Sequence, residues 1–186
     1  MGQVVYNPSN DLIQRIGSMA KRLARLERGN SFVTVSLFAG VIQSIPNAAW
    51  TRLTNFSNHA GSGNTPLHTY STECVSNASG VFQPLMQGLY EIEISCSFTS
   101  STITGERALY MCLNKTTAPT GTATDSREWR IADADSYGYV TLEGSKKMYL
   151  TPSDRLYFWC YQSSGATVNV NGQPGDGITF EFLGAW

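Results

Sequence analysis

Two histidines and a cysteine are the side chains whose types and spacing come nearest to catalytic chemistry. His59 and His68, the only histidines of the chain, fall in the segment "NHAGSGNTPLHTY", and Cys74 follows. A histidine that takes the thiol proton would make the cysteine a nucleophile, so the pattern allows a hydrolase. The sequence offers no residue to orient the histidine and no GxSxG elbow, and "GSG" at 61–63 is not set between a strand and a helix as a phosphate loop must be. We therefore expect polar loop residues here, no enzymatic activity and no cofactor.

A second polar segment, "RIADADSYGYV", places two carboxylates near aromatic rings. Asp133 and Asp135 carry the oxygen atoms that calcium prefers, but their spacing completes no calcium loop, so we expect a solvated turn and no metal site. Trp129, Tyr137 and Tyr139 flank the segment and could stack on the rings of a sugar. The alternative is that these aromatic side chains fill the core or a contact between subunits.

Composition limits the class of protein. The chain has 186 residues, of which 41% are hydrophobic and 11% aromatic, which is typical of a folded protein with one main core. Its net charge of −1 gives no basic excess, so we expect neither nucleic acid nor an anionic membrane as a partner. It shows neither a secretory signal nor an apolar run of about 18 residues, so we expect no export by the general pathway and no membrane insertion.

The four cysteines are widely spaced and form no CxxC motif. Three of them lie in strand-like runs, "ISCSF", "YMCLN" and "FWCYQ". We predict reduced core thiols rather than a disulfide framework or a zinc site at Cys74, Cys96, Cys112 and Cys160.

An amphipathic helix is predicted near the start of the chain. Asn7 provides an N-cap before Pro8, and Gly29 with Asn30 provides a stop signal. Between these ends, apolar residues recur at the a and d positions of a heptad repeat: Leu12, Ile16, Met19, Leu23 and Leu26. The stripe is narrow and the remaining residues are mostly charged, which favours a self-associating coiled coil at 8–29 over a helix lying on its own domain.

This coil is too short to be stable alone. Burial of five seam side chains contributes about 8–15 kcal/mol per chain, whereas ordering about twenty residues costs roughly 20–40 kcal/mol. The helix therefore needs copies that another contact has already gathered, which raises their effective concentration. The seam leaves the number of copies open, because Ile at a with Leu at d favours two strands.

From Phe32 onward the pattern is that of strands. About nine short apolar or alternating runs are separated by Gly, Asn, Ser and Pro, which predicts an antiparallel β-sandwich or jelly roll. In "LYEIEIS", apolar residues alternate with Glu91 and Glu93, which indicates one buried and one wet face. The polar connections 57–80, 114–126 and 162–177 should lie at the ends of the sandwich, where recognition is usually placed.

The run "GVFQPLMQGLY" and the order of the strands around it resemble the complement component 1q / tumour necrosis factor jelly-roll superfamily. The G-x-F-x-P-x-x-x-G-x-Y pattern of that family is matched by Gly80, Phe82, Pro84, Gly88 and Tyr90. A later Leu-x-x-x-Asp segment is matched by Leu150 and Asp154, although Ser153 replaces the usual glycine. The terminal strand also departs from the family pattern, with Phe182, Leu183 and Gly184. The resemblance covers about residues 32–186.

This resemblance implies a ten-stranded jelly-roll head, residues 30–186, in a compact homotrimer. Three such heads would gather three N-termini and let the helix close as a three-stranded coil. A short coil on such a head, after the tail "MGQVVYN" at residues 1–7, also resembles bacteriophage virion appendages such as tail fibres, baseplate proteins and head fibres. A bacterial or eukaryotic cytosolic protein is the alternative to this phage setting.

The phage interpretation predicts a virion protein that folds in the host cytoplasm. Its N-terminal tail would bind another virion protein, and its distal loops would contact a host glycan or protein. The structural alternative is a decoration or connector protein of the capsid or tail, without a receptor. A hydrolase that uses His59 or His68 is the third hypothesis.

Overall fold

The computed structural model describes residues 32–36, 42–58, 74–120, 126–171 and 176–185. The predicted tail at 1–7 and coiled-coil helix at 8–29 lie outside these ranges and stay predictions. Every regular element of the described residues is a strand: β1 (Phe32–Ser36), β2 (Ile42–Ile45), β3 (Thr51–Arg52), β4 (Ser57–Asn58), β5 (Val75–Ala78), β6 (Val81–Pro84), β7 (Gly88–Leu113), β8 (Trp129–Leu150), β9 (Leu156–Gln162), β10 (Val168–Asn171) and β11 (Gly177–Gly184). No helix long and apolar enough to cross a membrane occurs in this part of the chain.

The long strands β7 and β8 form the frame of the molecule. They pair antiparallel from Gly88 opposite Leu150 to Met111 opposite Trp129, with register shifts between Phe98 and Arg107. These irregularities bend the ribbon, so each strand takes part in two layers. The sequence predicted two separate strands, "GLYEIEISCSF" and "RALYMCLN", and this prediction was wrong. The polar residues between them continue the strand, because the register shifts absorb the change of direction.

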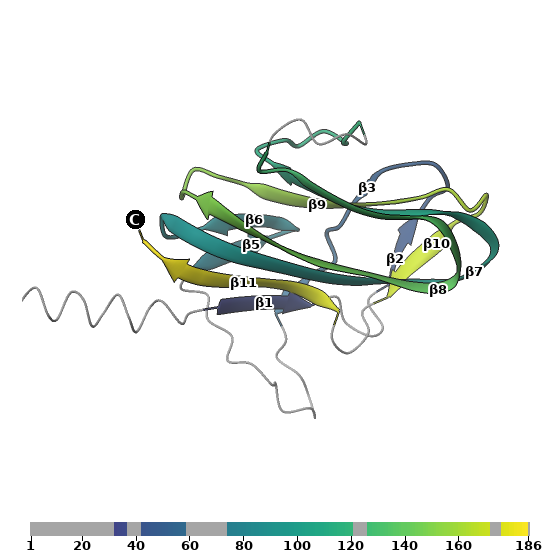
Figure 1. Cartoon of the computed structure of the whole chain (residues 1–186), viewed down its shortest axis with the longest axis horizontal. Coiled ribbons are helices and arrows are strands. Elements are labelled where there is room, and N and C mark those ends of the chain that lie inside the picture. Colours follow the sequence, from purple (N-terminus) through teal and green to yellow (C-terminus); the bar gives the residue numbers. More distant parts are fainter. Residues whose placement is uncertain (1–31, 37–41, 59–73, 121–125, 172–175, 186) are drawn as a thin grey trace, which may run out of the picture.

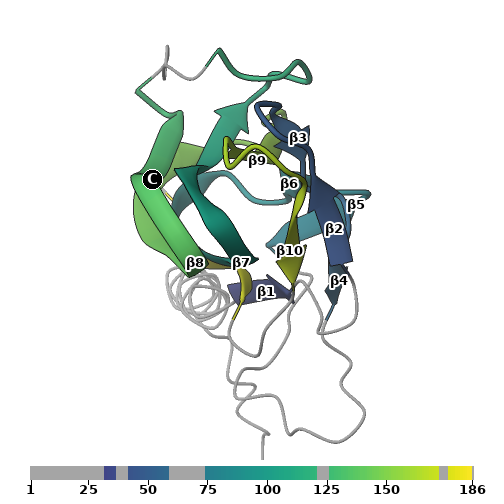
Figure 2. The ribbon, with the colours of Figure 1, turned by 90° about the vertical axis from the view of Figure 1, so that its right-hand side faces the viewer.

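The strands build two antiparallel layers (Figures 1 and 2). The first, which we call the β1 layer, has the order β4, β1, β11, first half of β7, second half of β8. The second, which we call the β9 layer, is built around β9. Strands β3 and β6 both pair with one edge of β9, the second half of β7 pairs with its other edge, and the first half of β8 pairs with that half of β7. Strand β5 extends this layer beyond β6, and β10 pairs with β2 and with β7 near the bend.

The core lies between the layers and follows the predicted alternation. Tyr90, Ile92 and Ile94 are buried, whereas Glu93 on the opposite face of the same strand is exposed. Aromatic rings fill the centre: Phe82 stacks on Phe180 at 5.3 Å between ring centroids and meets the edge of Phe158 at 5.4 Å.

All four cysteines are buried thiols and none forms a disulfide, which confirms the prediction for them. Cys96 Sγ lies 3.8 Å from Cys160 Sγ in the core.

Two residues of the G-x-F-x-P-x-x-x-G-x-Y pattern, Gly80 and Tyr90, have clear structural roles. Ser79 and Gly80, with φ of 52° and 73°, form the two-residue turn between β5 and β6. A Cβ atom on Gly80 would lie 2.2 Å from the carbonyl oxygen of Leu53. The hydroxyl of Tyr90 is buried and donates to the carbonyl oxygens of Met86 at 2.8 Å and Cys74 at 3.1 Å. These contacts hold the turn between β6 and β7 against the start of β5.

Several segments predicted as connections are strands. Residues 57–80 contain β4 and β5, and residues 162–177 contain β10. Asp133 lies within β8, so the solvated turn predicted around it is wrong. Short polar strands and long bent strands carry little hydrophobic periodicity, because their partners in the sheet, more than their own side chains, fix the extended backbone.

Candidate binding surface

The structure describes only some of the residues that suggested chemistry. His59 and His68 lie outside the described residues, and Cys74 is buried in the core beneath β6 and β7. Asp133 is exposed in β8, and the side chain of Asp135 lies outside the described part. Among the described residues, no three His, Cys, Asp or Glu side chains are grouped to hold a metal ion.

Of the three aromatic residues predicted to contact a ligand, the structure describes the side chains of Trp129 and Tyr139, and these two do not share one surface. Trp129 packs against the core, and its ring approaches to 2.5 Å the position that a Cβ atom on Gly144 would take. Trp129 is therefore partly buried against the core, and its role as a ligand contact stays a prediction. Tyr139 is 50% exposed but lies ten residues further along β8, near the bend. The side chain of Tyr137 lies outside the described residues.

An aromatic surface that the sequence did not single out covers the solvent side of the β9 layer. We call it the outer aromatic face, and it consists of Trp50, Tyr110, Tyr157, Trp159 and Tyr161. In β9 the odd-numbered residues of 157–161 point outward, whereas Leu156, Phe158 and Cys160 point into the core. Tyr110 of β7 lies opposite Trp159, so the rings of the two strands adjoin.

Trp50 lies across this face just before β3. Its ring centroid is 5.1 Å from that of Tyr161 and 5.8 Å from that of Tyr110, which it meets edge to face. Trp50 and Tyr161 are half-buried, whereas Tyr110, Tyr157 and Trp159 are almost completely covered. The two half-buried rings are therefore the part of the face that another molecule could touch.

The charges around the outer aromatic face are mostly paired. Arg130 forms an ion pair with Glu106, and Lys115 with Glu128. Arg52, directly opposite Trp159 in the sheet, instead places its guanidinium 5.8 Å from the ring centroid of Tyr157. Within the described residues, no carboxylate pairs with Arg52. Among the side chains that the structure describes, Arg52 is therefore a cation of this face without a carboxylate partner.

Glu128 links the connection between β7 and β8 to the outer aromatic face through a hydrogen bond with Tyr110. The hydroxyl of Tyr110 donates to Glu128 Oε2 at 2.9 Å, and Lys146 Nζ donates to the carbonyl oxygens of Ser126 at 2.6 Å and Glu128 at 2.7 Å. Burial, together with the bond to Glu128, raises the pKa of Tyr110. Burial, assisted by the charge of Glu128, also raises the pKa of Cys112 to about 11, so this thiol is protonated and unreactive at neutral pH.

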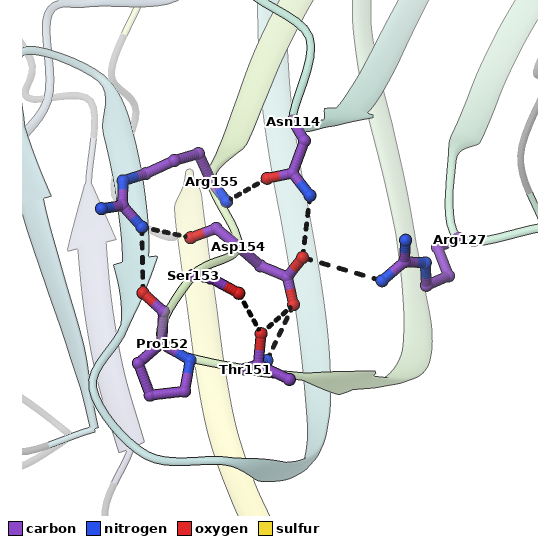
Figure 3. Close-up of polar contacts among 7 residues, drawn as sticks. All are labelled: Asn114, Arg127, Thr151, Pro152, Ser153, Asp154 and Arg155. Carbon is purple, nitrogen blue, oxygen red and sulfur yellow. Dashed lines mark hydrogen bonds and ion pairs between the residues drawn. The ribbon is translucent and has the colours of Figure 1, made fainter.

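Asp154 holds the same end of the sandwich together (Figure 3). Its carboxylate accepts hydrogen bonds from Asn114 Nδ2 and from the backbone N–H of Thr151, both at 2.8 Å, and from Thr151 Oγ1 at 2.9 Å. Arg127 lies 3.7 Å away, and Asn114 Oδ1 accepts the backbone N–H of Arg155 at 2.7 Å. Burial alone would raise the pKa of Asp154, but the bonds from Asn114 and Thr151 and the charge of Arg127 outweigh it and lower that pKa.

The solvent side of the β1 layer is different in character. It carries four glutamates and one lysine, namely Glu91, Glu93, Glu143, Glu181 and Lys147. Glu91 lies directly opposite Glu181, and Lys147 Nζ is 3.4 Å from Glu91 Oε2. This surface is polar and acidic, in contrast to the outer aromatic face.

At the end where β11 finishes, the β1 layer becomes apolar. We call this the basal patch, and it consists of Leu89, Tyr149 and Leu183. Leu89 pairs with Tyr149 in the sheet, and Leu183 is 38% exposed. Phe32 lies opposite Glu181, so the chain enters β1 close to this patch.

The sequence contained a signal for the outer aromatic face. In "LYFWCYQ" both alternating positions are apolar, which is typical of a strand covered on both sides. A two-layer sandwich covers only one side of each sheet, so the second apolar set required an explanation. The run was predicted only as a strand, and because its two faces were not distinguished, the outer aromatic face was not predicted.

Comparisons with known proteins support the fold. No protein-family model and no curated protein matches the sequence. Among solved structures, the Eiger TNF from S. frugiperda has a TM-score of 0.53 at 12% identity, over 84% of this chain and 96% of that one. The PRD1 vertex protein P5 has a TM-score of 0.52 at 16% identity, over 83% of this chain and 98% of that one. These likenesses confirm the predicted jelly-roll sandwich.

Proposed function

We propose that the chain is a non-enzymatic, homotrimeric virion structural protein that displays a jelly-roll head on a short coil. The observation that carries this proposal is a head with the fold of the PRD1 vertex protein P5, whose first strand follows a predicted coiled coil in the sequence. The basal patch lies close to the start of that strand, where three chains joined by a coil would meet. In the proposed assembly the N-terminal tail binds another virion protein.

Within this class, an adhesin is the function that the surface supports best. The outer aromatic face belongs to the β9 layer, whereas β1, which follows the predicted coil in the sequence, lies in the other layer. Figure 1 shows the two layers. Copies gathered at the basal patch would leave three aromatic faces directed outward. Three equivalent weak sites on one particle would act together when they meet a host surface.

A decoration or connector protein of the capsid is the second candidate. The PRD1 vertex protein P5 supports it, because a protein with the same fold is named as a vertex protein. Such a protein would stabilise the particle and would need no host ligand.

Antibody labelling of purified virions tests both candidates. An adhesin should be labelled at the end of a tail or spike, and the purified protein should block infection. A decoration protein should be labelled on the capsid, and the purified protein should leave infection unchanged. Virions that carry no label, and no peptide of this chain by mass spectrometry, would contradict both.

A further inference from the structure

We propose that the outer aromatic face binds an acidic saccharide, whose ring stacks on Trp50 and Tyr161 while its carboxylate pairs with Arg52. This inference rests on the adhesin function proposed above and names the class of its ligand. It concerns residues that the sequence analysis did not assign to a site.

The stacking part follows from the geometry of the rings. Trp50 and Tyr161 lie 38° from coplanar with their centroids 5.1 Å apart, which is too close for rings set edge to edge, so one ring leans over the other and the pair forms a single aromatic platform. Both are half-buried, which fixes their positions and leaves part of each ring accessible. A pyranose has a flat face of C–H groups of similar size, and aromatic side chains provide such contact area at little cost in conformational entropy.

The charge part follows from the pairing of the surrounding cations. Arg130 and Lys115 are already engaged by Glu106 and Glu128. Arg52 rests on Tyr157 beside the platform, and its planar guanidinium can hold a carboxylate with two hydrogen bonds. Neutral sugars would use the platform but would leave this cation unpaired.

A protein partner is the competing occupant of such a surface. A protein would need a wide apolar contact, but three of the five rings are covered by their own neighbours. Only Trp50 and Tyr161 keep an accessible part, which favours a small ring such as a saccharide.

The experiment uses the full chain on immobilised polygalacturonate, hyaluronate and polysialic acid, each compared with its methyl-esterified neutral form. We expect binding to at least one acidic polymer and about tenfold weaker binding to its ester, since a hydrogen bond to a charged group is worth that much or more. Arg52→Gln should weaken binding to the acidic polymer by about tenfold without changing binding to the ester. Trp50→Ala should abolish both.

The matched controls are Lys147→Gln, which removes a cation from the opposite layer, and Tyr139→Ala, which removes an exposed ring elsewhere. Both should bind like the wild type. Trp50→Ala could perturb folding, so its thermal unfolding is compared with that of the wild type. Whether Arg52 binds the carboxylate is decided by Arg52→Gln alone. Failure of the wild type to bind any acidic polymer, equal binding to the ester, or an unchanged Arg52→Gln variant would overturn the inference. A chain that labels virions but binds none of these polymers would refute this inference and leave the virion function intact.

Discussion

At the scale of single residues, Asp154 links sequence, structure and stability most directly. It receives three hydrogen bonds and an ion pair from two segments that are about forty residues apart in sequence. Its carboxylate therefore joins the turn between β8 and β9 to the connection between β7 and β8. Ser153 stands where the resembled family usually has glycine. Its hydroxyl shares a hydrogen bond of 2.8 Å with the hydroxyl of Thr151 in the same turn.

Replacement of Asp154 by asparagine should destabilise the protein by about 1–3 kcal/mol at neutral pH. The NH2 group of the asparagine would take the place of a carboxylate oxygen and would face a hydrogen-bond donor, so that hydrogen bond would be lost. The folded pKa of Asp154 is lowered, so its stabilising contribution is complete above the unfolded pKa of about 3.9 and is lost as the pH falls through the folded value. The difference between wild type and Asp154→Asn in denaturant unfolding should therefore shrink at acid pH.

Glu93→Gln is the control for this measurement, since it also neutralises a carboxylate but lies exposed on the β1 layer. It should change stability by less than about 0.5 kcal/mol. A pH-independent difference between wild type and Asp154→Asn would show that the carboxylate charge has no part in the stabilisation.

Residue types predicted the core better than the candidate site. The alternation around Ile92 and the buried cysteines could be predicted because a single strand carries the whole signal. The outer aromatic face could not, because it depends on Trp50, Tyr110 and Trp159 meeting across three strands. Trp129 and Tyr139 were grouped because they are near in sequence, but they lie ten residues apart along the same extended strand, β8.

At the scale of elements, tight turns fix which strands pair. Ser79 and Gly80 both have positive φ, which matches a two-residue turn to the twist of β5 and β6. Gly80 is also packed against the backbone of Leu53, ahead of β4. The family pattern predicted glycine here, and the structure gives two physical reasons for it.

Gly80→Ala should therefore destabilise the protein by about 2–5 kcal/mol. About 1–2 kcal/mol comes from the left-handed conformation of a residue with a Cβ atom, and about 1–3 kcal/mol from displacement of the backbone of Leu53. Gly138→Ala is a matched control, because Gly138 has a similar φ of 76° but nothing within 4 Å of its added Cβ atom. In thermal or denaturant unfolding, Gly138→Ala should lose only the about 1–2 kcal/mol that comes from the left-handed conformation. Equal losses for the two variants would mean that the contact with Leu53 is not strained.

The long bent ribbon of β7 and β8 marks the limit of prediction at this scale. Periodicity located both halves of β7 but not their continuity, because the register shifts at the bend interrupt the alternation. The partners of each half, β11 and β9, are distant in sequence and become evident only in three dimensions.

At the scale of the whole molecule, charge distribution restricts where copies of the head can meet. The β1 layer carries Glu91, Glu93, Glu143 and Glu181 against Lys147, so a close contact through its centre would bring carboxylates together without partners. The basal patch is apolar and lies where the chain enters β1. A contact between heads should therefore be centred on the basal patch.

Leu183→Glu should then weaken association of the full chain and lower its mass in light scattering at micromolar concentration, because three added carboxylates would face one another near the axis. Ile42→Glu, which changes another exposed apolar residue on β2, should leave the mass unchanged. If Leu183→Glu retains the mass of the wild type, the basal patch is not the contact between heads.

The order of assembly follows from the energetics of the predicted coil. Its five seam residues supply less free energy than the ordering of about twenty residues costs, so the heads must associate first. A fragment of residues 32–186 should therefore have three times the mass of one chain by light scattering, whereas a peptide of residues 1–31 should be largely unfolded by circular dichroism. Ile16→Asn in the full chain should leave the trimer intact and reduce only the helical signal. A monomeric head together with a self-associating peptide would reverse this order and make the coil the element that gathers the heads.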